Sequence, residues 1–244
     1  MTNSLPIVAE TWQQTLNWQP NPQQQLKFQQ LYELILEGNR QLNLTRITDP
    51  QEFWEKHLWD SLRGIVLQGK FIPSLETGAS VIDIGTGAGF PGIPVAIVAP
   101  NCTITLLDST RKKITFIDTI LTRLALGNAK TLLGRAEEIG QQQHRQIYDI
   151  ALIRAVGTAS ACAEYALPLV KQGGLAVIYR GTWTKEETKS LQNAVNQLGG
   201  VIECIEQFTT PLSNSIRHCL YLRKVATTPT NFPRAVGVPT QKPL

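Results

Sequence analysis

Three glycines at alternate positions follow an acidic residue in the stretch Val81 to Gly92, whose sequence is VIDIGTGAGFPG. The apolar run before Gly85 predicts a buried β-strand, and residues 90–99 predict the start of a helix. A strand that enters a glycine loop and then a helix brings backbone N–H groups and a helix N-terminus to one point. This arrangement predicts a site for a nucleotide-like ligand.

Two classes of cofactor fit such a loop. Asp83 lies inside the predicted strand, two residues before Gly85, and Gly85, Gly87 and Gly89 have the spacing G-x-G-x-G. An acid followed by this spacing resembles the S-adenosylmethionine loop of class I methyltransferases. The dinucleotide pattern G-x-G-x-x-G also matches, beginning at Gly87, but its first glycine falls two residues late relative to the end of the strand. A nicotinamide cofactor is therefore the second hypothesis.

A second acidic residue, Asp108, ends the predicted strand 103–108 and lies 23 residues after Gly85. An acid at the end of the second strand of a doubly wound sheet faces the ligand crevice, where it can accept hydrogen bonds from both ribose hydroxyls. The alternative is a helix cap, a role for which Ser109 and Thr110 compete. Strand position and spacing together favour the ligand role.

The loop GRAEE, residues 134–138, follows the next predicted strand and is expected to reach the same crevice. There the backbone groups of Ala136 and Glu137 could frame an adenine edge, although the residues alone fit a short surface turn equally well.

Arg154 follows the predicted strand 148–153, and a basic residue at the carboxyl end of a central strand lies near the crevice. Its guanidinium could hold a carboxylate or a phosphate bidentately. An ion pair with Asp149 or Glu164 is the alternative. His57 lies on a helix with a regular apolar stripe, so we interpret it as a packed or hydrogen-bonded histidine rather than a catalytic group.

Alternating strands and helices from residue 80 onward must position these residues, and they predict a mainly parallel, doubly wound α/β sheet. No helix separates the last two strands, which are therefore expected to pair antiparallel. The expected strands are 80–84, 103–108, 129–133, 148–153, 175–180, 201–207 and 216–224, and the later helices are 111–126, 158–170 and 184–198.

The first third of the chain is expected to be helical and without strands, with helices over 7–18, 22–40 and 50–68. At the start of the third helix Asp49 can cap, Pro50 fits the first position and Glu52 can close a capping box. We therefore expect an N-terminal helical extension (1–70), a cofactor-binding domain (71–225) and a proline-containing basic tail (226–244), which is expected to be extended and without a helix.

Charge and composition restrict the partners. The net charge is +4, and no acidic residue follows Glu206, whereas basic residues continue to Lys242; Arg111 to Lys113 forms a second basic cluster. Such patches suit contact with RNA, although a solvated surface explains them equally well. We find no membrane span, no secretory signal and no metal-ligand spacing. The four cysteines lie in apolar contexts, which predicts reduced thiols in a cytoplasmic protein.

Several longer motifs give the chain a clear family resemblance. It resembles the bacterial small-subunit ribosomal RNA guanine-N7 methyltransferases, the glucose-inhibited division protein B family, over nearly its whole length. The matching segments are LNLT at 42–45, HLWDSL at 57–62, DIGTGAGFPGIP at 83–94, LDS at 107–109, RAE at 135–137, IRA at 153–155 and FPRAVGVP at 232–239. The resemblance implies a class I S-adenosylmethionine-dependent methyltransferase (Rossmann-like) fold with a seven-stranded, mostly parallel sheet. It also implies cofactor contacts at Gly85, Phe90, Asp108, Ser109, Thr110, Ala136, Glu137 and Arg154.

The implied reaction transfers a methyl group from S-adenosylmethionine to N7 of a guanine in 16S rRNA, either free or in the small ribosomal subunit. Guanine N7 carries a lone pair and no proton, so no general base is required, and orientation can supply the catalysis. In agreement, the motif of amino-group methyltransferases is absent, and we assign no catalytic residue. We expect a monomer. The alternatives are a catalytically silent RNA-binding protein of the same fold and a methyltransferase of small molecules.

Overall fold

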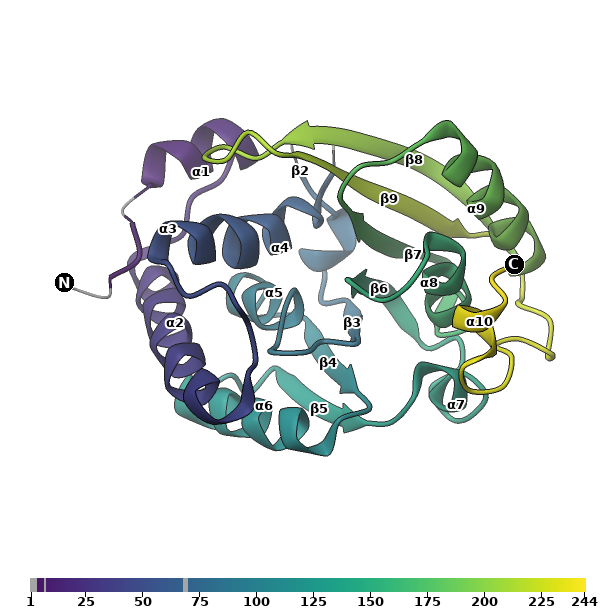
Figure 1. Ribbon diagram of the computed structural model, residues 1–244, viewed down its shortest axis with the longest axis horizontal. Helices are drawn as coiled ribbons and strands as arrows, with labels where there is room; N and C mark the ends of the chain where they lie inside the picture. The colour runs from purple at the N-terminus through teal and green to yellow at the C-terminus, as the bar shows by residue number, and fades with distance from the viewer. Residues whose placement is uncertain (1–3, 7, 68–69) are drawn as a thin grey trace.

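The computed structural model describes residues 4–6, 8–67 and 70–244. Within these residues a seven-stranded sheet runs through the molecule in the order β5-β4-β3-β6-β7-β9-β8 (Figure 1). Neighbouring strands are parallel from β5 to β7, whereas β9 pairs antiparallel with both β7 and β8. The strands are β3 (Ser80–Ile84), β4 (Thr103–Asp108), β5 (Ala129–Leu133), β6 (Tyr148–Arg154), β7 (Val170–Arg180), β8 (Gly200–Thr209) and β9 (Ile216–Lys224). The predicted fold class and the antiparallel last pair are confirmed.

Both faces of the sheet are buried, because apolar side chains alternate between two hydrophobic clusters. On β6, Ile150 and Leu152 belong to one cluster, and Ala151 and Ile153 belong to the other. The first face is covered by α1 (Ala9–Leu16), α2 (Pro22–Leu42), α3 (Pro50–Phe53), η1 (Trp54–Trp59), α4 (Asp60–Arg63), α5 (Gly92–Val98) and α6 (Arg111–Arg123). The opposite face carries α7 (Ala136–Ile139), α8 (Ala159–Ala166), α9 (Lys185–Gln197) and α10 (Val238–Gln241) (Figure 1).

The third N-terminal helix begins as predicted but has a different interior. The Asp49 carboxylate accepts hydrogen bonds from the backbone N–H groups of Gln51 and Glu52, each at 2.9 Å, with Pro50 in the first turn. The helix then continues as the π-helical segment η1 and ends at Arg63. A π-helical turn changes the direction in which successive side chains point, and such turns are frequent at functional sites.

Strands inside the first seventy residues contradict the expectation of a purely helical segment. β1 (Val66–Leu67) pairs antiparallel with β2 (Lys70–Phe71), and the short 3₁₀ helix η2 (Pro73–Leu75) follows. The hairpin satisfies backbone groups after the helix ends, for example through the hydrogen bond from Ile72 N to Ile65 O at 3.0 Å. The end of the predicted helix, residue 68, lies outside the described residues, as does residue 7, the predicted start of the first helix.

The N-terminal helices pack on the sheet itself. One hydrophobic cluster contains Trp12, Leu31 and Phe53 from the helices together with Ile104 and Leu152 from the strands. The extension therefore shares its core with the sheet, and the division at residue 70 stays a prediction that falls inside the β1–β2 hairpin.

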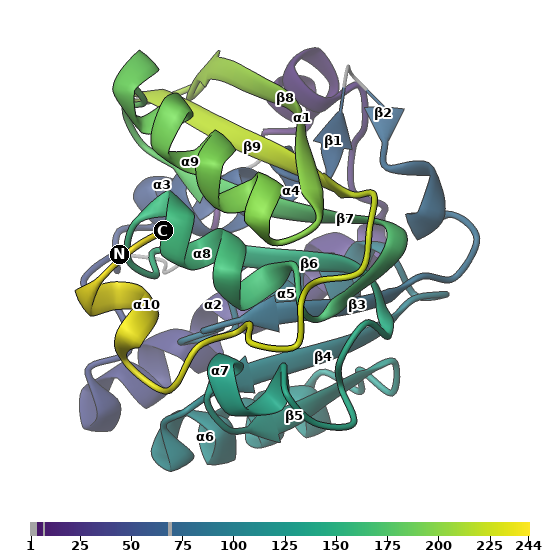
Figure 2. The same ribbon diagram turned by 90° about the vertical axis from the view of Figure 1, so that its right-hand side faces the viewer.

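The tail after β9 corrects a second expectation. It contains the short helix α10, with Pro239 in the first turn, where a proline costs no intrahelical hydrogen bond. The rest of the tail is irregular, and it runs past α7 and α8 on the outside of the sheet (Figures 1 and 2).

Candidate active site

The predicted site residues meet at the carboxyl ends of β3, β4, β5 and β6. The chain leaves β3 in one direction towards β4 and β5, and in the other towards β6 and β7, so this edge is a topological switch point. A cavity of about 280 Å³ opens there, which is the order of size of a small-ligand site. It is lined by Ile84, Gly85, Leu107, Asp108, Ser109, Thr110, Lys113, Gly134, Arg135, Ala136, Glu137, Ala155, Val156 and Tyr165.

Six of the eight predicted cofactor residues therefore line one cavity: Gly85, Asp108, Ser109, Thr110, Ala136 and Glu137. The other two, Phe90 and Arg154, are not among its lining residues. Sequence reasoning missed Val156 and Tyr165 as lining residues. Val156 lies in the loop after β6, so its position next to Arg154 was a usable signal, whereas Tyr165 comes from α8 and has no signal in the linear sequence.

The glycine loop is shaped by close contacts. Gly85 has a φ of +69°, and a Cβ there would lie 2.7 Å from Val156 Cγ2, so both conformation and space require glycine. Upstream, the buried Asp83 Oδ2 accepts hydrogen bonds from Gly92 N at 2.8 Å and from Thr86 Oγ1 at 2.6 Å. Its Oδ1 has no hydrogen-bond partner within the described residues. Burial raises the pKa of Asp83 to about 6, against these hydrogen bonds.

Asp108 connects the glycine loop to the end of β4. Its Oδ2 accepts a hydrogen bond from Gly87 N at 3.0 Å, and its Oδ1 accepts one from Thr110 N at 2.8 Å. Lys113 Nζ lies 3.7 Å from Oδ2. Thr110 is the N-cap of α6 but makes no capping bond with its own side chain, so Asp108 supports this turn and also lines the cavity. Each carboxylate oxygen has a further lone pair available to a hydroxyl group.

These contacts separate the two cofactor hypotheses. A dinucleotide needs free backbone N–H groups for its pyrophosphate, but Gly87 N is already bonded to Asp108 and Gly92 N to Asp83. A pyrophosphate would be placed against two carboxylates. The same acidic wall suits an adenosine whose ribose donates hydrogen bonds and whose sulfonium carries a positive charge, so the cavity fits S-adenosylmethionine.

Phe90 belongs to an aromatic cluster beside the cavity. The rings of Phe90 and His57 are stacked with centroids 4.4 Å apart and planes 12° apart. Phe53 meets both rings edge-on, and the Arg154 guanidinium carbon lies 5.9 Å from the centre of the Phe90 ring. The helical segment η1 thus carries His57 to the loop that the glycine motif forms.

Arg154 is held by the same segment. Its Nη1 donates hydrogen bonds to Lys56 O at 3.0 Å and to Asp60 Oδ2 at 2.9 Å. The expected alternative partners, Asp149 and Glu164, are wrong. Alternate side chains of a strand face opposite sides of the sheet, so Arg154 lies on the side of η1. Asp149 instead pairs with a lysine of β7, and Glu164 with an arginine of the tail.

His57 is a packed, hydrogen-bonded residue, as interpreted from the sequence. Its Nε2 shares a hydrogen bond with Thr45 Oγ1 at 2.9 Å, and its Nδ1 lies 3.5 Å from Arg154 Nη2. Burial, and then the charges of Arg154 and Lys56, lower the pKa of His57 to about 3. Because an arginine only donates, a neutral ring with its proton on Nε2 fits both neighbours. A neutral ring lacks the second, acidic proton of an imidazolium, so His57 is not a general acid at neutral pH.

The predicted basic patch of the tail is largely used inside the molecule. Lys224 is fully buried and donates to Leu167 O and Leu198 O at 2.8 and 3.2 Å. Arg223 pairs with Glu203 on β8, and Arg234 is held by a buried carboxylate. Lys224 is therefore buried and Arg234 is bound to an acid, whereas the RNA contacts of the other tail cations stay a prediction.

Other cations remain exposed around the cavity. Arg111 and Lys112 begin α6, Arg135 precedes α7, and Arg46 follows Thr45, the partner of His57; all four side chains are exposed. Among the described residues none of the four forms an ion pair. We call these four residues the basic rim.

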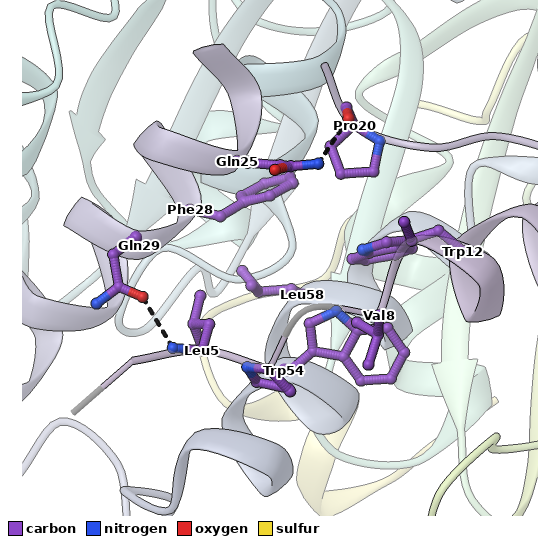
Figure 3. A pocket seen from close by; sticks show the side chains of 11 residues that line it. Leu5, Val8, Trp12, Pro20, Gln25, Phe28, Gln29, Trp54 and Leu58 are labelled. Atoms are coloured by element: carbon purple, nitrogen blue, oxygen red, sulfur yellow. Dashed lines mark hydrogen bonds between the residues drawn. The ribbon is translucent and has the colours of Figure 1, made fainter. Parts of the chain in front are cut away.

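A second cavity lies under the N-terminal segment, between Trp12, Phe28, Trp54 and Leu58 (Figure 3). Its polar contacts are the hydrogen bonds Leu5 N to Gln29 Oε1 and Gln25 Nε2 to Pro20 O. None of the described residues that line it is charged. It holds none of the predicted site residues, and it lacks the charged groups that would orient a polar cofactor.

Residues 4–6, 8–67 and 70–244 contain neither a membrane-spanning helix nor a cluster of metal ligands. No helix in these ranges is long and apolar enough to cross a membrane. No group of three histidine, cysteine or acidic side chains is gathered there in a way that could hold a metal ion.

Known proteins resemble this chain in sequence and in fold. A family model described as rRNA small subunit methyltransferase G matches residues 24–219. The chain is 78% identical to the Ribosomal RNA small subunit methyltransferase G of Trichormus variabilis and 76% identical to that of Nostoc punctiforme, over 100% of each chain. Among solved structures, a variant of the 16S rRNA (adenine(1408)-N(1))-methyltransferase from Catenulisporales acidiphilia aligns with a TM-score of 0.52 and 14% identity, covering 64% of this chain and 91% of that one. This last likeness concerns the fold alone.

Proposed function

We infer that this chain, which belongs to the rRNA small subunit methyltransferase G family, is an S-adenosylmethionine-dependent methyltransferase of 16S rRNA whose donor site is the cavity beside the glycine loop. We further propose that the acceptor atom is N7 of a guanine. The observation that carries the proposal is Asp108, which faces the cavity while its oxygens bond the glycine loop and the start of α6.

Each lining residue has a role in this proposal. Asp108 accepts hydrogen bonds from the ribose hydroxyls, and Ser109 and Thr110 flank it. The backbone of Ala136 and Glu137 frames the adenine edge. Gly85 allows the donor to approach the main chain, and the cluster of Phe90 and Arg154 bounds the end of the site that faces η1. When bound, S-adenosylmethionine supplies a methyl group on a positively charged sulfur.

Methylation of guanine N7 requires no acid or base from the protein. Guanine N7 has a lone pair and no proton, so the protein need only align it with the methyl group. Two polar side chains packed around Phe90 agree with this requirement: the His57 ring is neutral and hydrogen-bonded to Thr45, and the Arg154 guanidinium is held by Asp60. Neither is a suitable general base, and we assign no catalytic residue.

The RNA is expected to approach over the basic rim. Arg135 lines the cavity, and Arg111 and Lys112 follow the lining residue Thr110 at the start of α6. Arg46 follows Thr45, the partner of His57. Exposed cations of this kind bind phosphates without reading sequence. The guanine must be unpaired or loosened, because N7 of an RNA helix lies in a deep, narrow groove. The basic rim therefore replaces the tail as the proposed RNA contact.

We also propose that the chain works as a monomer in the cytoplasm, where its free cysteines remain reduced. Light scattering after size exclusion, at the concentration used for activity, tests the oligomeric state.

Methyl transfer itself is tested with donor labelled in the methyl group. The chain is incubated with small subunits, and separately with free 16S rRNA, from cells that lack the modification, and the digested RNA is analysed for labelled 7-methylguanosine. Label in that nucleoside is expected from one of the two substrates. Binding of donor and RNA with no label would instead identify a silent RNA-binding protein, and label that appears only in small molecules would identify the third hypothesis. An Asp108→Ala variant is the matched control for label that does not depend on the site.

A further inference from the structure

The C-terminal segment 227–244, which we call the strap, lies against the helices that wall the cofactor cavity (Figure 2). Its first anchor is Arg145, whose guanidinium donates to three strap carbonyls: Thr228 O at 2.7 Å, Pro229 O at 3.1 Å and Phe232 O at 2.7 Å. Phe232 itself is buried in the hydrophobic cluster of this face. The start of the strap is therefore fixed to the domain.

The second anchor is an ion pair with a fully buried acid. Arg234 donates to Glu164 with its backbone N at 2.8 Å, its Nε at 2.9 Å and its Nη2 at 2.6 Å. A guanidinium that bonds both carboxylate oxygens is a strong and directional contact. These two anchors fix the position of the remaining residues, 235–244, on the surface of the domain.

That place is the back of the cofactor cavity. Gly237 N donates to Glu137 Oε1 at 3.0 Å. The Thr240 hydroxyl donates to Gly237 O at 3.1 Å and lies beside the Tyr165 side chain. Both partners, Glu137 and Tyr165, line the cavity. Gly237 has a φ of +83°, a conformation that favours glycine, so the N–H is aimed at Glu137 by a turn that other residues adopt poorly.

Without the strap, these two cavity side chains lose their polar partners. Glu137 is 6% exposed, and a buried carboxylate without a donor is costly, so it would turn towards the cavity or towards water. Either movement changes the wall against which an adenosine must lie. We propose that the strap positions Glu137 and Tyr165 and thereby sets the affinity of the cavity for S-adenosylmethionine, with Gly237 and Thr240 as its positioning residues.

This inference rests on the proposed donor site. It gives the tail a role in donor binding in place of the RNA-binding role expected from its charge. A basic arm would act on RNA, whereas the strap acts on the donor site. Of the tail cations, Arg234 is occupied by Glu164, and Lys242 remains exposed. The two roles predict different effects of removing the end of the chain. Loss of a basic arm would weaken RNA binding, whereas loss of the strap would weaken donor binding.

The test compares the full chain with a variant that ends at Val236, which retains both anchors. Calorimetric titration with S-adenosylmethionine should show a Kd about tenfold higher for the shortened chain, the usual size of losing a buried polar contact. Its affinity for a 16S rRNA fragment should stay within about twofold, since the basic rim is intact. An unchanged Kd for the donor would overturn the proposal. If the full chain itself bound no donor, the proposed function would fail instead.

A second set of variants tests whether the strap acts by positioning Glu137 and Tyr165, by the charge of Lys242, or by a general loss of rigidity in the domain. Thr240→Val removes the hydroxyl that bonds Gly237 O and lies beside Tyr165, and should weaken donor binding. Lys242→Ala removes the exposed charge and should not weaken it. In a Glu137→Ala background the truncation should cost much less than in the parent, because the contact is already gone. Full additivity of these two changes, or weakening by Lys242→Ala equal to that of the truncation, would each show that the strap does not act through Glu137.

Discussion

His57 gives the sharpest quantitative prediction, because its neutral state is built into the fold. The pKa of this ring is lowered from 6.5 to about 3 by burial and by neighbouring cations. Below pH 6.5 the unfolded chain takes up a proton on this ring that the folded chain refuses. The group therefore stabilises the fold fully above pH 6.5, and this stability is lost as the pH falls towards 3.

The magnitude follows from the size of the pKa shift. One pKa unit corresponds to about 1.4 kcal/mol, so the 1.5 units between pH 6.5 and pH 5 remove about 2 kcal/mol of the free energy of unfolding. Asp83 acts in the opposite sense. Its pKa is raised from 3.8 to about 6, so the folded chain binds the proton first and gains roughly 1 kcal/mol at pH 5. The contributions of the two groups partly cancel in the native protein.

A His57→Gln variant separates the two contributions. The glutamine keeps a donor for Thr45 but has no titrating group, so only the Asp83 contribution remains. The difference in stability between native protein and variant should narrow by about 2 kcal/mol between pH 7.5 and pH 5. In a chain of this length that is roughly 4 to 8 °C in Tm.

The assay is urea or thermal unfolding of the ligand-free chain, followed by circular dichroism at pH 7.5, 6 and 5. Asp83→Asn is the control: it removes the opposing group, so this variant should lose about 2 kcal/mol over the same pH interval. The contrary outcome is a difference in stability between the native protein and His57→Gln that stays constant with pH. That result would refute the claim that His57 is buried and neutral with a lowered pKa.

Three further predictions concern binding and stability. Asp108→Asn has one acceptor oxygen in place of two and should raise the Kd for S-adenosylmethionine about tenfold or more in calorimetry; a Kd within about twofold contradicts the ribose role. Replacing Arg111, Lys112 and Arg135 together by alanine should weaken binding to a 16S rRNA fragment and lower the slope of log K against log salt by about 2. An unchanged slope would show that these three residues do not contact phosphates. Arg234→Ala leaves a buried carboxylate unpaired and should cost roughly 3 kcal/mol in urea unfolding, and a loss below about 1 kcal/mol would show that water compensates it.

The sequence alone was sufficient for the fold class and for bringing six of the predicted residues to one cavity. Strand and helix patterns have local causes, namely apolar periodicity, glycine and proline positions and helix caps such as Asp49. The carboxyl ends of parallel strands meet at one edge, so Gly85, Asp108 and Ala136 could be placed together from the order of elements. Arg154 was also placed near this edge from its strand, whereas Phe90 was named only through family resemblance.

The sequence alone could not predict which side chains form ion pairs and hydrogen bonds with residues far away in the chain. The alternative partners named for Arg154 were Asp149 and Glu164. Its partners are instead Lys56 O in η1 and Asp60 in α4, 98 and 94 residues earlier in the chain, because these two elements lie on the same face of the sheet as the arginine. The same holds for Lys224, whose charge suggested an exposed patch, although its side chain is buried against carbonyl groups of two other elements. A charge in the sequence does not tell whether water or a buried acceptor surrounds it.

The sequence by itself determined that a glycine loop with two acids lies at the carboxyl edge of a doubly wound sheet, since those features follow from spacing and strand order. Only the tertiary structure decided what each acid does. The amides of Gly87 and Gly92 are bonded by Asp108 and Asp83, and this excludes a pyrophosphate there. It also decided that the tail supports Glu137, because a hydrogen bond between residues a hundred positions apart depends on how the chain folds and leaves no trace in local pattern.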